Sequence, residues 1–140
     1  MVIESGTKLY QLNSFTALKD SVYKYTEKIV SKLQPDYIQI GNEINPMILQ
    51  KGELVWPIDW NRNSYLINKG IKAVRDISKD SGNKVEVMLH IAQPENGLWW
   101  FKQATENGIT DFDWIGLSYY PLWSEYKLDN VGAAFKELIT

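Results

Sequence analysis

Helical and strand patterns alternate along the whole chain of 140 residues, and this alternation constrains the fold more than any other feature. From Phe15 to Leu33, apolar residues recur every three or four positions, which predicts an amphipathic helix that ends before Pro35. A β-prone run from Tyr37 to Gly41 follows it. Further helices are predicted over 64–79, 97–107 and 130–139, and further strands over 85–91 and 114–120.

Strict alternation predicts parallel strands that are joined by right-handed crossovers and covered by helices. Three strands do not close a (β/α) barrel, because that fold needs eight. The chain is therefore either a small open sheet or part of a barrel, and its helix-first order favours part of a barrel. We expect an α/β fold with three parallel strands and four helices, in one incomplete domain over residues 1–140.

The predicted strands carry polar residues on one face and aliphatic residues on the other, because alternate residues of a strand point to opposite sides. The carboxyl ends of barrel strands carry the active site. Glu43, His90 and Tyr120 are therefore expected to meet at one rim. The residues of this face are Tyr37, Gln39, Gly41 and Glu43, then Met88 and His90, then Gly116, Ser118 and Tyr120.

Structural explanations also exist for these residues. A glutamate after a strand is often a solvated loop residue or a helix cap. His90 is the only histidine, and it fits a core or rim position with satisfied nitrogens better than a zinc site. Tyr119 and Tyr120 would also fill the mouth of a barrel.

The chain is rich in aromatic residues, with six tryptophans and eight tyrosines. Flat rings suit both protein cores and the apolar faces of sugars. Trp99 and Trp100 lie on a predicted helix and are expected in the core. Trp56 and Trp123 lie near prolines in loops after strands, where exposed rings stack on sugars.

Composition excludes several classes of function. The net charge of −2 comes without a basic stripe, so nucleic acid is not an expected partner. No apolar run of about 18 residues is present, and the first residues lack the pattern of a signal peptide, so no membrane contact is expected. The absence of cysteine removes disulfides and thiolate catalysis. No metal and no cofactor are expected.

The segment Gly41-Asn42-Glu43-Ile44-Asn45 resembles the acid/base motif on the fourth strand of the retaining clan A glycosidases. In particular it is similar to glycoside hydrolase family 53, the endo-β-1,4-galactanases. The similarity covers nearly the whole chain in order. Its other segments are 68–75, 88–90, 95–101 and 110–123.

This resemblance implies part of an eight-stranded barrel whose fourth to sixth strands are the three predicted here. It implies that Glu43 is the general acid/base and that Asn42 binds the sugar 2-hydroxyl. The family's nucleophile is a glutamate at the end of the seventh strand, which is expected beyond Thr140. Neither Glu125 nor Glu137 occupies a strand end, and the loop after Glu43 is longer than expected for the family.

The implied reaction is endo-hydrolysis of β-1,4-galactan or arabinogalactan with retention, by a secreted or periplasmic parent enzyme. A proton donor needs a raised pKa, which a neighbouring carboxylate and partial burial would cause for Glu43. The expected substrate-binding residues are Asn42, His90, Tyr119, Tyr120, Trp56 and Trp123.

Two alternatives to an active enzyme stay open. One is a galactan-binding remnant without activity, because half a site still offers stacking and hydrogen bonds. The other is a structural half-barrel that associates with another chain, or with a copy of itself, through its exposed barrel edges.

Overall fold

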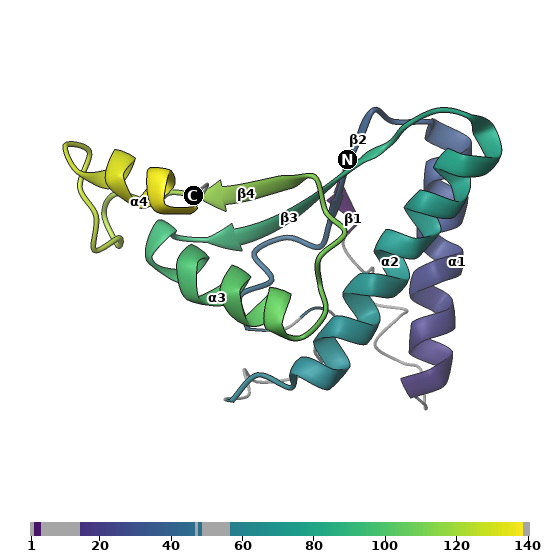
Figure 1. The fold of residues 1–140 in the computed structure, drawn as a ribbon, viewed down its shortest axis with the longest axis horizontal. Coiled ribbons are helices and arrows are strands. Elements are labelled where there is room, and N and C mark those ends of the chain that lie inside the picture. The colour runs from purple at the N-terminus through teal and green to yellow at the C-terminus, as the bar shows by residue number, and fades with distance from the viewer. Residues whose placement is uncertain (1, 4–14, 47, 49–56, 139–140) are drawn as a thin grey trace.

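A computed structural model describes residues 2–3, 15–46, 48 and 57–138 of the chain. Helices and strands alternate along it, as the sequence predicts (Figure 1). The elements are β1 (Val2–Ile3), α1 (Phe15–Leu33), β2 (Tyr37–Ile40), α2 (Trp60–Ser81), β3 (Glu86–Ala92), α3 (Pro94–Glu106), β4 (Trp114–Ser118) and α4 (Val131–Leu138). No helix in these ranges is long and apolar enough to cross a membrane.

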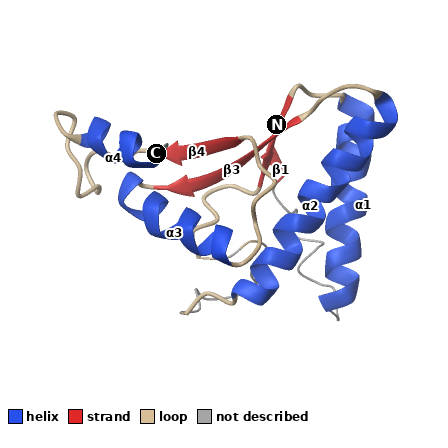
Figure 2. Cartoon of the chain, viewed as in Figure 1, coloured by secondary structure: helices blue, strands red, loops and turns tan. Residues whose placement is uncertain are grey.

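The strands form one parallel sheet in the order β1-β2-β3-β4 (Figure 2). Gln39 of β2 lies beside Met88 of β3, and His90 of β3 lies beside Gly116 of β4. The prediction of a helix-first chain with three strands is wrong in one respect, because β1 precedes α1. A two-residue strand is too short to show a periodic pattern, and only its pairing with β2 identifies it.

Helices cover one face of the sheet, with α1 packed beside α2 and α3 running below β3 and β4 (Figure 1). On β2 and β3, the strand residues that face these helices are aliphatic and at most 2% exposed, as predicted from the alternation, whereas Ile115 and Leu117 of β4 are partly buried. Trp100 of α3 is fully buried among them, which confirms its assignment to the core. The residues of β2 and β3 that face the helices are Ile38, Ile40, Val87, Leu89 and Ile91.

The opposite face of the sheet carries the predicted polar set and is more open. Tyr37 is 52% exposed and Trp114 is 47% exposed. Gly116 lies so close to β3 that an added Cβ would sit 2.8 Å from the sulfur of Met88 and 3.0 Å from Cδ2 of His90. This proximity confirms that these three residues share a face.

Several elements begin or end at residues other than those predicted. Helix α2 begins before residue 64, because the carboxylate of Asp59 caps it by accepting the N–H of Arg62. Helix α3 begins at Pro94, a residue that suits a first helical turn. Strand β4 stops at Ser118 instead of residue 120, because the N–H of Tyr120 bonds to the side chain of Gln93.

Candidate active site

Glu43 lies just beyond the carboxyl end of β2 in a left-handed backbone conformation, with φ 47°. Gly41 precedes it with φ 77°, and an added Cβ there would collide with Ile44, so the turn into this segment requires glycine. His90 of β3 holds the turn. Its Nδ1 accepts the N–H of Glu43 at 3.0 Å, and its carbonyl accepts the N–H of Ile44 at 3.0 Å.

The carboxylate of Glu43 receives hydrogen bonds from the end of β4. The phenol of Tyr120 donates to Oε1 at 2.6 Å, and the hydroxyl of Ser118, which lies 3.1 Å from Nε2 of His90, contributes to lowering the pKa of the carboxylate. The structure thus brings together Glu43, His90 and Tyr120 at one rim, as the alternation of the strands predicts.

These donors lower the pKa of Glu43, with Tyr120 as the largest cause, because they stabilise the ionised carboxylate. Partial burial opposes them, while Ser118 and His90 act in the same direction as Tyr120. The prediction of a raised pKa concerns Glu43 beside a second carboxylate, and it stays a prediction. Among the groups that shift the pKa of Glu43 in the described part of the chain, none is a second carboxylate.

His90 uses both ring nitrogens within the protein. Because Nδ1 accepts a backbone N–H, the proton of the neutral ring lies on Nε2, which faces the hydroxyl oxygen of Ser118 at 3.1 Å. Burial lowers the pKa of His90, and the charge of Glu43 opposes this only in part. His90 is thus a neutral residue that connects β2 to β4.

The other predicted sugar-binding residues are arranged in different ways. Asn42 is exposed, and its Oδ1 accepts the side-chain amide of Gln39 at 3.2 Å. Trp123 is 73% exposed, and its ring lies edge-to-face with Tyr120 at 5.9 Å between centroids. Tyr119 turns to its own loop, where its hydroxyl donates to the carbonyl of Tyr126 at 3.1 Å. Trp56 lies outside the described residues.

Comparison with known proteins identifies the family. The sequence pattern of glycosyl hydrolase family 53 matches residues 7–140.

The chain belongs to this family.

Two relatives of this family 53 chain are galactanases. It is 52% identical over 128 residues to an arabinogalactan endo-β-1,4-galactanase of Cellvibrio japonicus, covering 86% of the chain and 34% of the relative. It is 31% identical over 117 residues to an endo-β-1,4-galactanase of Bacillus subtilis, covering 79% of the chain and 25% of the relative. The chain thus spans about a third of these relatives or less.

The fold is also that of a galactanase. A solved structure of fungal β-1,4-galactanases superposes with a TM-score of 0.74 at 22% sequence identity, over 91% of the chain and 41% of the fungal chain. The predicted fold class, part of a (β/α)8 barrel, is confirmed.

Two residues of the candidate site were not predicted from the sequence. Asn45 exchanges two hydrogen bonds with the backbone of Ala92, both at 2.7 Å, and so ties the Glu43 segment to β3. Gln93 bonds to the backbone of Tyr120. The position of Asn45 as the last residue of the Glu43 motif was an available signal, whereas nothing in the pattern around Gln93 indicates its role.

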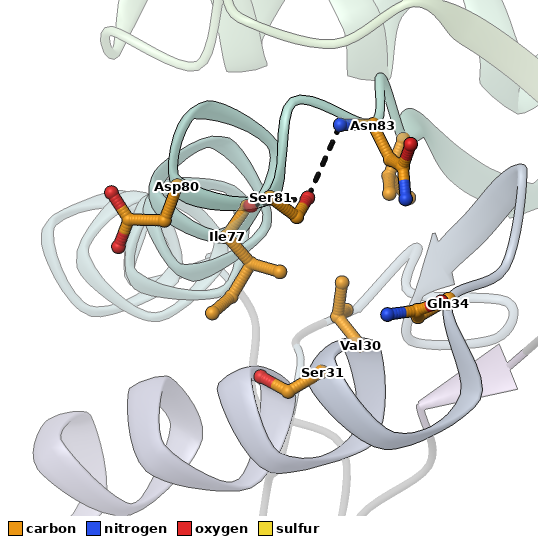
Figure 3. Close-up of a pocket in the computed structure, with 8 residues that line it drawn as sticks. Val30, Ser31, Gln34, Ile77, Asp80, Ser81 and Asn83 are labelled. Carbon is orange, nitrogen blue, oxygen red and sulfur yellow. Dashed lines mark hydrogen bonds between the residues drawn. The ribbon is translucent and has the colours of Figure 1, made fainter.

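A pocket of about 250 Å³ lies between the carboxyl ends of α1 and α2 (Figure 3). Gln34 precedes β2 and Val85 precedes β3, so the pocket lies at the amino ends of the strands, opposite Glu43. Active sites of barrel enzymes lie at the other end. The lining residues are Val30, Ser31, Gln34, Ile77, Asp80, Ser81, Asn83 and Val85.

Proposed function

We propose that this chain is the acid/base part of a glycosidase that hydrolyses β-1,4-galactosidic bonds in galactan or arabinogalactan. The observation that carries the proposal is the position of Glu43, which lies at a strand's carboxyl end and receives the phenol of Tyr120 at 2.6 Å. The names of the two galactanase relatives support the substrate. Because this substrate is a polysaccharide, we expect the whole protein to act outside the cytoplasm.

In the proposed mechanism, protonated Glu43 gives its proton to the leaving oxygen while a second carboxylate attacks the anomeric carbon. Glu43 then removes a proton from a water molecule that attacks the same carbon and displaces the carboxylate, and the two successive inversions retain the configuration. The lowered pKa of Glu43 suits the second step. A nucleophilic carboxylate about 5 to 5.5 Å away would raise that pKa for the first step, since two neighbouring negative charges repel.

The proposed sugar contacts lie around Glu43. The exposed amide of Asn42 binds the 2-hydroxyl, and the exposed ring of Trp123 stacks on a sugar face. The predictions that Trp56 stacks on a sugar and that Tyr119 binds one are retained. Sugar binding by His90 is also retained, but it requires a ring nitrogen to release Glu43 or Ser118.

The experiment is to incubate the chain with β-1,4-galactan and to measure both new reducing ends and bound polysaccharide. Glu43→Gln removes the acid/base with little change in shape, and Glu106→Gln on the exposed surface of α3 is the matched control. If the chain supplies both carboxylates, we expect hydrolysis by the chain and by Glu106→Gln, and its loss in Glu43→Gln; a chain that holds only Glu43 of the pair is expected to bind galactan without cleaving it. Hydrolysis by Glu43→Gln would overturn the role of Glu43. A chain that neither hydrolyses nor binds galactan would overturn the proposed function.

A second candidate is the remnant that binds galactan without cleaving it. It is favoured by the exposed Trp123 and by the fact that no second carboxylate shifts the pKa of Glu43 among the described residues. Binding of galactan without new reducing ends, lost in Trp123→Ala, would select it.

We also propose that the chain associates through its open sheet. In the described sheet, β4 has a partner strand only at β3, and Tyr37 and Trp114 are exposed on the uncovered face. We expect sedimentation to show concentration-dependent association. A monomer at high protein concentration would contradict it.

A further inference from the structure

Gln93 has an unusual backbone conformation directly after β3. Its φ of 69° and ψ of 133° lie in a region that residues with side chains rarely adopt. It lies between Ala92, the last residue of β3, and Pro94, the first residue of α3. This conformation directs the chain from β3 into α3 and leaves the Gln93 side chain beside the end of β4.

The side-chain amide of Gln93 bonds to the backbone of Tyr120 in both directions. Its Nε2 donates to the carbonyl of Tyr120 at 3.3 Å, and its Oε1 accepts the N–H of Tyr120 at 3.1 Å. The backbone N–H of Gln93 also donates to the carbonyl of Ser118 at 2.8 Å. Gln93 therefore continues the pairing between β3 and β4 beyond the last residue of β4.

The other backbone bonds to Tyr120 come from its own loop. The N–H groups of Trp123 and Ser124 both donate to its carbonyl at 3.0 Å. They give the loop its shape but do not attach Tyr120 to the sheet. Glu95 holds the loop further along, where its carboxylate accepts the hydroxyl of Ser124 at 2.8 Å. Among the backbone bonds described for Tyr120, those to Gln93 are the ones that join it to the sheet.

We propose that Gln93 is a positioning residue, whose side-chain amide holds the backbone of Tyr120 where its phenol donates to Glu43. Both ends of the amide are engaged, so the amide is already occupied by the protein. The proposal concerns the placement of one hydrogen-bond donor at Glu43, and it holds whether or not the chain hydrolyses galactan.

The other groups that face Glu43 do not depend on this amide. His90 is neutral and bonds to the Glu43 backbone, and Ser118 is attached through the backbone N–H of Gln93, which every variant keeps. Removal of the Gln93 side chain therefore perturbs the Tyr120 contact alone.

The experiment measures the pKa of the Glu43 carboxyl by carbon NMR in the full chain, with the signal assigned by Glu43→Gln. Gln93→Gly removes the amide and suits the positive φ, so the backbone is expected to keep its course. Because Tyr120 is the largest cause of the lowered pKa, we expect this pKa to rise in Gln93→Gly and in Tyr120→Phe. In a Tyr120→Phe background, Gln93→Gly is expected to cause no further rise.

Gln93→Asn is the second variant, because asparagine tolerates positive φ but its shorter side chain does not span both backbone groups of Tyr120. It is expected to raise the pKa as well. Gln103→Ala on α3 is the matched control and leaves the pKa unchanged. An unchanged pKa in both folded Gln93 variants overturns the proposal, as does an equal rise with and without the Tyr120 hydroxyl. No step of the test uses activity, so its failure is distinct from failure of the proposed function.

Discussion

Asn45 provides a direct test of how the Glu43 segment is attached to the sheet. Its side chain donates from Nδ2 to the carbonyl of Ala92 at 2.7 Å and accepts the N–H of Ala92 on Oδ1 at 2.7 Å. Asn45→Ala removes both bonds. The carbonyl of Ala92 keeps a partner in this variant, because Asn96 also donates to it at 2.9 Å. Only the N–H of Ala92 loses its acceptor.

A part-buried polar group without a partner costs about 1–3 kcal/mol, and loss of a neutral hydrogen bond costs about 0.5–1.5 kcal/mol. We therefore expect Asn45→Ala to lower the free energy of unfolding by about 2 kcal/mol. Asn96→Ala leaves both backbone groups of Ala92 bonded and removes one further contact, with Trp99 at 3.3 Å. We expect it to cost about 1 kcal/mol or less.

Urea unfolding, followed by tryptophan fluorescence, measures the free energy of unfolding of both variants. The two values are compared when the free energy falls with urea concentration at the same slope. Both variants lose a bond to the same carbonyl, so the extra cost of Asn45→Ala is a lower bound on the cost of the unsatisfied Ala92 N–H, because Asn96→Ala also loses the Trp99 contact. A cost for Asn45→Ala equal to or below that of Asn96→Ala would refute this reasoning. In that case, the exchange with Ala92 would not be what secures the Glu43 segment.

Three further predictions follow from single contacts. Burial opposes ionisation of Asp113, but the N–H of Val87 and the guanidinium of Arg75 outweigh it and lower its pKa. The ionised Asp113 therefore stabilises the fold fully above about pH 4, and this stabilisation is lost as the pH falls through the lowered pKa. The stability of Asp113→Asn should depend less steeply on pH, as measured by acid unfolding followed by circular dichroism. Trp123→Ala should weaken galactan binding in affinity electrophoresis while leaving the melting temperature unchanged, because the ring is 73% exposed. Leu89→Ala should cost about 2–5 kcal/mol in urea unfolding, because the side chain is fully buried, and a cost below about 1 kcal/mol would contradict its place in the core.

The order of the elements and the two faces of the sheet were predictable from the sequence. Both depend on local periods of about two and 3.6 residues, which the chain itself displays. The predicted helix over 15–33 has the observed bounds, and the inward and outward residues of the three longer strands are as expected. Strand β1 was not predictable, because two residues show no period and their partner β2 lies far along the chain.

The residues of the candidate site were predicted in part. Placing Glu43, His90 and Tyr120 at one rim needed only strand parity and the parallel arrangement. Their contacts needed the tertiary structure, since Glu43 bonds to residues 47 and 77 positions away. The lowered pKa of Glu43 in this chain was not predictable for the same reason, because it depends on which donors reach the carboxylate.

The sequence by itself determined the alternation, the buried aliphatic face, the family motif and the end of the sheet where the polar residues gather. Each of these follows from neighbours in the chain or from a period along it. Only the tertiary structure decided that His90 is a neutral link, that Asn45 ties the Glu43 segment to β3 and that Gln93 holds Tyr120. Those roles depend on strand register and on side-chain hydrogen bonds of about 3 Å between distant residues, which local sequence does not encode.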